Sequence, residues 1–121
     1  MRKLILHPLF LLGLAIRLVL IFTTEPIAVS DWYVPFLDTS TVYFTLDPWS
    51  VWLNGGGIPV AFPYGYAMWL AFLPLTIVAK LIGLPLLYGY GFTILAADFA
   101  LLLVLHHLLP DRDRLLLVAY W

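Results

Sequence analysis

The chain has 121 residues, of which 64% are hydrophobic and 11% are charged, and its formal net charge is −1. A soluble domain of this size cannot bury so large an apolar fraction, so lipid is the expected solvent. The charge balance excludes a basic nucleic-acid-binding surface, because Lys and Arg are not in excess to neutralise phosphates. The absence of cysteine excludes disulfides, thiolate chemistry and cysteine metal sites.

The first apolar run predicts a membrane-spanning helix over residues 4–22, since backbone groups in lipid must bond within their own segment. Arg2 and Lys3 precede it, which places the N-terminus in the cytoplasm under the positive-inside rule. A secretory signal peptide can begin in the same way. This run is longer than a signal core and lacks a small-residue cleavage site before Glu25, so a retained anchor is favoured.

Residues 24–62 are therefore predicted to form a large loop on the extracytoplasmic side, in the periplasm, a lumen or the extracellular space. The loop contains no Lys or Arg and four acidic residues: Glu25, Asp31, Asp38 and Asp47. Within it, the pattern over residues 38–46 is compatible with either a helix or a strand.

A short helix is predicted near residues 48–54. Asp47 suits the capping position and Pro48 the first helical position. Such a helix would carry Trp49 and Trp52 on one side, which is typical of a helix that lies in the membrane interface.

Two further spans are predicted, over residues 63–82 and 84–109, with Lys80 at the cytoplasmic end of the first of them. The run over residues 115–121 is too short to cross and predicts the start of a fourth span. The expected fold class is all-α: a polytopic transmembrane protein with about three complete spans and a large first outer loop. The chain is expected to be one membrane domain at the front of a longer protein.

Arg17 lies within the first predicted span and Asp98 within the third. An ionised group inside a span costs several kcal/mol unless it is paired or hydrated. Counted from Leu4 and Leu84, both residues lie roughly 20 Å from the cytoplasmic end at about 1.5 Å per residue. We expect an ion pair between them. The alternative is that Arg17 extends to the outer headgroups and Asp98 faces a hydrated cavity.

Asp31 is the candidate for acid–base chemistry, because it follows the first span closely and is expected at the outer membrane surface. A carboxylate there can accept a proton from a hydroxyl nucleophile within hydrogen-bond reach. The alternative is a solvated loop acid or a helix cap. Asp38 and Asp47 each precede a plausible helix or turn start, which favours capping roles for both.

No metal or other cofactor is expected. His106 and His107 are adjacent, and adjacent residues do not share a helix face, so a two-ligand zinc site is disfavoured. The glycine run over residues 55–57 lacks the lysine of a phosphate-binding loop.

Four segments together resemble the N-terminal part of the GT-C superfamily of multi-pass membrane glycosyltransferases. They are AIRLVL in the first span, SDWYVPFL after it, AFPYGYAMWLAFLP at the start of the second span and AADFALLLVL in the third. The resemblance implies transfer of a sugar from a polyprenyl-phosphate donor to an acceptor hydroxyl on the extracytoplasmic side.

By that resemblance, Asp31 would be the general base, and Trp32, Tyr33 and Tyr64 would line a sugar or lipid site. The implied partners are membrane lipid, the polyprenyl-phosphate-linked sugar and further protein segments or a second chain that completes the fold. Two other classes remain open: a non-catalytic scaffold subunit, and part of a transporter in which Arg17 and Asp98 line a path.

Overall fold

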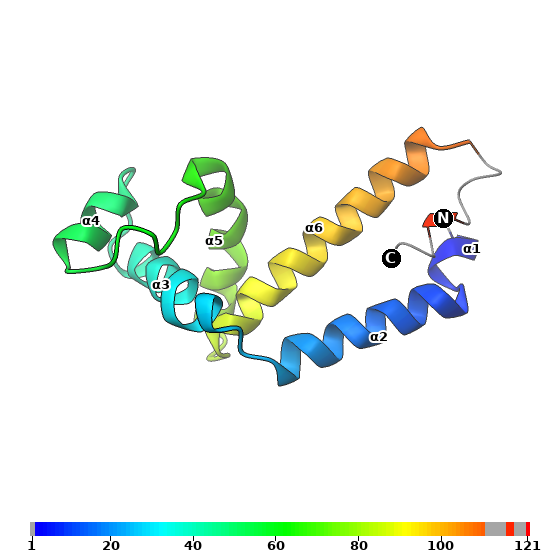
Figure 1. The fold of residues 1–121 in the computed structure, drawn as a ribbon, viewed down its shortest axis with the longest axis horizontal. Coiled ribbons are helices and arrows are strands. Elements are labelled where there is room, and N and C mark those ends of the chain that lie inside the picture. The colour runs from blue at the N-terminus through cyan, green and yellow to red at the C-terminus, as the bar shows by residue number, and fades with distance from the viewer. Residues whose placement is uncertain (1, 111–115, 118–120) are drawn as a thin grey trace. The chain divides into compact units, whose positions relative to one another are not determined.

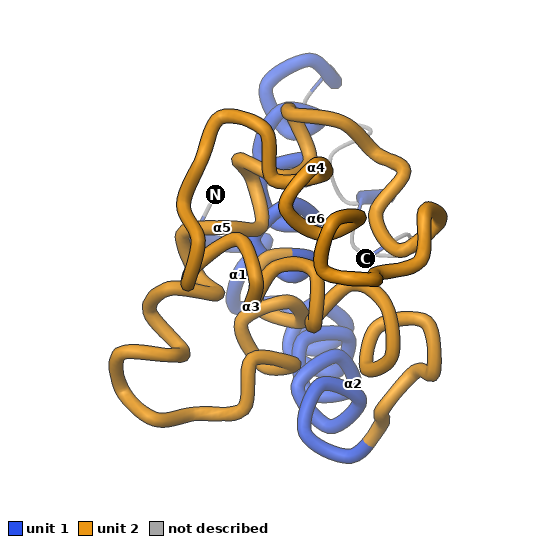
Figure 2. The backbone as a smooth tube through the Cα atoms, turned by 90° about the vertical axis from the view of Figure 1, so that its left-hand side faces the viewer, with its two compact units in different colours: residues 1–23, 94–121 blue, residues 24–93 orange. Residues whose placement is uncertain are grey.

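The computed structural model describes residues 2–110, 116–117 and 121. The regular structure of these residues is helical throughout, in agreement with the expected all-α class (Figure 1). The chain divides into two compact units (Figure 2). Unit 1 comprises Met1–Thr23 and Ile94–Trp121, and unit 2 comprises Thr24–Thr93. The elements in chain order are α1 (Arg2–Ile5), α2 (Pro8–Thr23), the π-helix η1 (Val29–Tyr33), α3 (Val34–Val42), α4 (Pro48–Asn54), α5 (Gly65–Leu81) and α6 (Leu86–Leu108).

Among the described residues, one helix is long and apolar enough to cross a membrane, and it is α6 with 23 residues. It lies inside the span predicted over residues 84–109. The other two apolar helices are shorter: α2 has 16 residues and α5 has 17. The segment predicted as the start of a fourth span, residues 115–121, falls mostly outside the described residues.

The first predicted span is interrupted. α1 ends at Ile5 and α2 begins at Pro8, because proline has no N–H to donate and suits the first position of a helix. His7 satisfies one of the free amides at this new start, since its Nδ1 accepts a hydrogen bond from the Leu9 amide at 3.3 Å.

The predicted outer loop over residues 24–62 is largely helical. The undecided segment over residues 38–46 continues α3 to Val42 and then leaves the helix. The predicted helix near residues 48–54 is confirmed as α4. Asp47 caps it by accepting a hydrogen bond from the Ser50 amide at 3.1 Å, as its position before Pro48 indicates.

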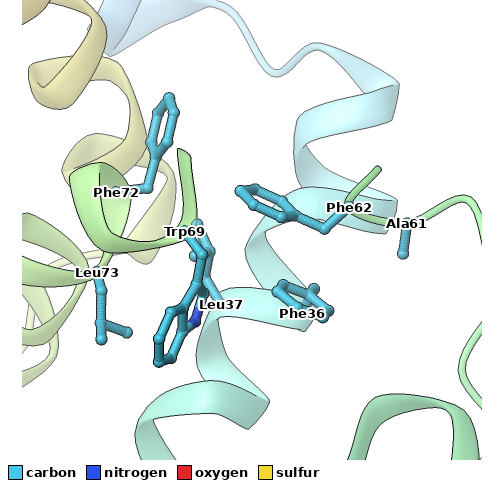
Figure 3. Packing of buried hydrophobic residues seen from close by; sticks show 7 residues of the cluster. All are labelled: Phe36, Leu37, Ala61, Phe62, Trp69, Phe72 and Leu73. Carbon is cyan, nitrogen blue, oxygen red and sulfur yellow. The ribbon is translucent and has the colours of Figure 1, made fainter. Parts of the chain in front are cut away.

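Aromatic side chains form the core of unit 2, where α3 packs against α5 (Figure 3). The rings of Phe36 and Phe62 stack with centroids 4.9 Å apart. Trp49 of α4 joins this core and donates its indole N–H to the Phe62 carbonyl at 2.9 Å. The buried members of the cluster are Phe36, Leu37, Ala61, Phe62, Trp69, Phe72 and Leu73.

A smaller core lies in unit 1, between the N-terminal helices and the C-terminal part of α6. Phe10 is its most buried ring, with 2% of its surface exposed. It stacks on Trp121 with centroids 5.0 Å apart and meets the edge of Phe99 at 6.2 Å. The buried residues of this cluster are Leu4, Phe10, Leu102 and Leu117.

Candidate functional site

The candidate base Asp31 lies in η1, the π-helical turn that leads directly into α3. This turn forms just after Pro26, whose carbonyl accepts hydrogen bonds from the amides of Val29 and Ser30 at 2.9 and 3.0 Å. Single π-helical turns are rare and occur frequently at functional sites. The structure therefore places the predicted acid on an unusual stretch of backbone, which follows α2 shortly along the chain.

The Asp31 carboxylate is exposed, and its hydrogen bond comes from a neighbour in the same turn. Ser30 Oγ donates to Asp31 Oδ1 at 3.2 Å. The same hydroxyl also lies 3.2 Å from the Ile27 carbonyl. An exposed carboxylate held in this way can receive a proton from a hydroxyl that a substrate brings within reach.

Tyr33 and Tyr64, two of the three predicted binding residues, meet in unit 2. Their hydroxyl oxygens are 2.8 Å apart and share a hydrogen bond, and their rings meet at an angle of 68°. Tyr33 comes from the end of η1, and Tyr64 lies immediately before α5. The hydrogen bond to Tyr64 raises the pKa of the Tyr33 phenol, and desolvation of the ring adds to this effect.

Tyr90 is the third tyrosine of this cluster, and sequence reasoning did not identify it. Its ring stacks on Tyr33 with centroids 5.8 Å apart and on Phe72 at 4.5 Å. Tyr90 lies in the first turns of α6, within the predicted third span. An aromatic residue in such an apolar segment does not stand out from its neighbours. The one sequence signal is its position between Gly89 and Gly91, since small residues allow helices to approach closely.

Gly89 makes that close approach between α5 and α6 possible. A Cβ atom at this position would lie only 2.6 Å from the Leu75 carbonyl oxygen, so a side chain would force the two helices apart. The contact lies one residue from Tyr90. The tyrosine cluster therefore depends on the glycine beside it.

Asp31 and Tyr33 do not form one site within the described structure. Residues two positions apart in a helical turn face different directions, and Tyr33 faces Tyr64 and Tyr90. Trp32 is exposed on the surface, with 38% of its area accessible. The structure brings Tyr33 and Tyr64 together, but leaves the predicted base and Trp32 on other sides of the same turn.

Arg17 and Asp98 form an ion pair within unit 1, with Nε of Arg17 3.1 Å from Oδ2 of Asp98. The guanidinium carbon also lies 4.4 Å from the centre of the Trp121 ring, an arrangement that favours a cation–π interaction. The two charges therefore neutralise each other between two apolar helices.

Lys80 forms the second ion pair, within unit 2. Its Nζ donates to Asp38 Oδ1 at 2.5 Å and to Thr41 Oγ1 at 2.9 Å, which joins the end of α5 to α3. In the predicted topology, Asp38 lies on the extracytoplasmic side and Lys80 at the cytoplasmic end of a span. Two atoms in hydrogen-bond contact cannot lie on opposite sides of a bilayer, so these two assignments do not hold together.

The described residues contain no group of three or more His, Asp or Glu side chains that could hold a metal ion. His106 and His107 lie in the last turn of α6. Comparison of the chain with models of protein families, with curated proteins and with solved structures found no match.

Proposed function

We propose that this chain is part of a membrane glycosyltransferase that moves a sugar from a polyprenyl-phosphate donor to an acceptor hydroxyl on the extracytoplasmic side. The observation that carries the proposal is the exposed Asp31 carboxylate in a π-helical turn, placed just after the first apolar helix. Asp31 would act as the general base that accepts the proton of the acceptor hydroxyl as its oxygen attacks the sugar.

The tyrosine cluster supports a binding role in the same proposal. Tyr33 and Tyr64 hold their rings at a steep angle and join their hydroxyls, so they offer both an apolar face and a hydrogen-bonding edge. That combination suits a sugar, which has C–H faces and hydroxyl edges, or the boundary between a lipid chain and its phosphate. Trp32 is exposed on another side of the same turn and would be free to contact the donor lipid.

Replacement of Asp31 by Asn tests the proposal. It removes the base and retains the shape of the side chain. In membranes that contain the protein, sugar transfer from a panel of polyprenyl-phosphate hexoses should fall by a factor of about 100 or more, since positioned bases contribute about 10²–10⁴. The amount of protein in the membrane should not change.

Asp47→Asn is the matched control, because Asn caps a helix as well as Asp and the residue has no role in the proposed chemistry. Its transfer rate should equal that of the unchanged protein. Equal transfer by Asp31→Asn would remove Asp31 as the base.

A non-catalytic scaffold is the second candidate, and one observation favours it: Asp31 and the tyrosine pair face different sides of η1. A scaffold would lose assembly with its partner subunits when α3 or α5 is disturbed. It would tolerate Asp31→Asn in every assay. The transporter alternative is less favoured, because Arg17 neutralises the Asp98 carboxylate that would have to line an ion path.

A further inference from the structure

The ion pair of unit 1 joins two antiparallel segments. Arg17, near the end of α2, bonds to Asp98 of α6. Leu4, near the start of the chain, lies in one buried cluster with Leu102, which is further along α6. Figure 1 accordingly shows the start of α2 and the end of α6 at the same end of this unit. The expectation of equal depth in two parallel spans is therefore replaced by a pair between opposed helices, which the long Arg side chain can reach across.

Asp98 lies at the middle of α6, the one described helix that is long and apolar enough to cross a membrane. The middle residue of Leu86–Leu108 is its neighbour Ala97. If α6 crosses a bilayer, the Asp98 carboxylate is therefore close to the centre of the hydrocarbon. An ionisable side chain at that depth faces other protein or a hydrated cavity, because lipid tails offer it no hydrogen bond.

The hydrogen bonds of this ion pair are incomplete within unit 1. Arg17 donates from Nε to Asp98 Oδ2 at 3.1 Å and from Nη1 to the Gly13 carbonyl at 3.4 Å. Within the described residues, Nη2 of Arg17 donates no hydrogen bond and Oδ1 of Asp98 accepts none. The two side chains are 27% and 42% exposed. Unit 1 therefore carries an open donor and an open acceptor side by side on its surface.

The side of α6 that carries Asp98 is otherwise apolar and exposed. Ile94, Asp98, Leu101 and Leu108 recur at positions i, i+4, i+7 and i+14, which places them along one side of the helix. We call these four residues the Asp98 stripe. Its apolar members are 42%, 58% and 74% exposed in chain order. Helices that pair along their length meet through residues at this spacing. Lipid can cover the apolar members, but it cannot bond to the open donor and acceptor.

A second copy of the chain fits this surface, because the surface is complementary to itself in charge. Copies of one protein enter a membrane in one orientation, so their α6 helices run parallel and equal positions meet across a two-fold axis. The open Nη2 of Arg17 in each copy can then donate to the open Oδ1 of Asp98 in the other copy. The two contacts close a ring of alternating Arg and Asp side chains that has no net charge. A helix with a donor alone or an acceptor alone would leave one of the two groups unbonded.

We infer that the chain forms a dimer in the membrane through the Asp98 stripe of α6, with the ring of Arg17 and Asp98 side chains at its centre. Polar side chains join membrane helices in this way, because an unbonded polar group in hydrocarbon is unfavourable. The inference rests on α6 crossing a membrane. It makes no use of Asp31 or of the proposed sugar transfer, so it stands or falls separately from them.

Disulfide cross-linking tests this interface, since the chain contains no native cysteine. Leu101→Cys places a thiol on the stripe. Leu103→Cys is the matched control, because it also replaces an exposed leucine of α6, but residues two positions apart face different sides of a helix. Membranes from cells that express two copies with different epitope tags would be oxidised. Leu101→Cys should give a product of twice the mass that carries both tags, whereas Leu103→Cys should remain monomeric.

Absence of the Leu101→Cys dimer, with the protein present in the membrane, would overturn the inference, since lipid would then cover the stripe. Equal cross-linking of both cysteine variants would overturn it as well, because the contact would not be specific to one side of α6. A cross-linked product that never carries both tags would identify a different helix as the partner and exclude the second copy.

The double variant Arg17→Leu with Asp98→Leu tests the ionic ring by a second measurement. It removes both charges together, so no unpaired charge is left in unit 1. Energy transfer between copies labelled at the N-terminus would give the dissociation constant of the dimer in micelles. That constant should rise by a factor of roughly ten, because each hydrogen bond between membrane helices contributes modestly.

Asp38→Leu with Lys80→Leu is the control for the double variant, because it removes the ion pair of unit 2, which lies outside the stripe. The dissociation constant should not change in this control. An unchanged constant in Arg17→Leu with Asp98→Leu, with helical circular dichroism retained, would show that the ring does not hold two copies together and would overturn the inference.

Discussion

Arg17 and Asp98 lie 3.1 Å apart on two antiparallel apolar helices, and their side chains remain 27% and 42% exposed. A charge in this position is tolerated because the opposite charge lies beside it. The same contact defines how α2 and α6 are aligned in unit 1. It therefore contributes both to the stability of unit 1 and to the alignment of its two long helices.

Removal of either charge alone should destabilise the protein. Asp98→Ala leaves Arg17 without its carboxylate between apolar helices, and we expect a loss of about 2–3 kcal/mol in the free energy of unfolding. The measurement is thermal or denaturant unfolding in detergent micelles. The charge-swapped variant, Arg17→Asp with Asp98→Arg, should recover at least half of the loss.

Arg2→Ala is the control for that experiment, because Arg2 is exposed at the start of α1 and its loss should leave stability unchanged. If the swapped variant is no more stable than either single variant, the pair does not hold the helices together.

Gly89→Ala should separate α5 from α6. The new Cβ atom would lie 2.6 Å from the Leu75 carbonyl oxygen, which is backbone and cannot rotate away. Overpacking of this kind costs about 1–3 kcal/mol, which unfolding in micelles would measure. Gly55→Ala is matched in chemistry, but its Cβ would meet its nearest neighbour at an ordinary 3.4 Å. Equal stability of the two variants would show that the helices do not approach closely at Gly89.

Tyr64→Phe should lower the pKa of Tyr33 toward its ordinary value of 10.0, because it removes the hydrogen bond that raises it. The folded-state pKa is raised, so this contact stabilises the fold below pH 10 and loses its effect as pH rises through the folded pKa. Ultraviolet difference titration of the phenolate band would follow the change. Tyr66→Phe is the control: its hydroxyl donates to the Leu46 carbonyl instead, and the titration of Tyr33 should not move.

Acidification should loosen α4. Ser50 donates hydrogen bonds to the Asp47 carboxylate from its hydroxyl and its amide, and these bonds lower the pKa of Asp47 below the ordinary 3.8. The stabilisation of the helix start is therefore present above pH 3.8 and is lost as pH falls through the folded pKa. Hydrogen exchange of residues 48–54 should accelerate over that range. In Asp47→Asn, exchange should be independent of this titration; a persistent pH effect would place its origin elsewhere.

Features that depend on neighbouring residues were predictable without coordinates. Helical structure follows from apolar runs whose backbone groups must bond within one segment. α4 and its cap follow from Asp47 and Pro48, because capping is satisfied within a single turn. The pairing of Arg17 with Asp98 was predictable because two opposite charges in apolar helices have few other partners.

Contacts between segments distant in the chain required the tertiary structure. Hydrophobic periodicity contains no information on whether α6 runs with or against α2. The predicted spans and the positive-inside rule placed Lys80 and Asp38 on opposite sides of a membrane, whereas the two side chains form a hydrogen bond. The contact between Tyr90 and Tyr33 depends on Gly89, because the absence of a side chain there allows the backbones of α5 and α6 to approach closely. Local chemistry selects the helices and their ends, whereas the packing of side chains between helices selects their order, direction and shared sites.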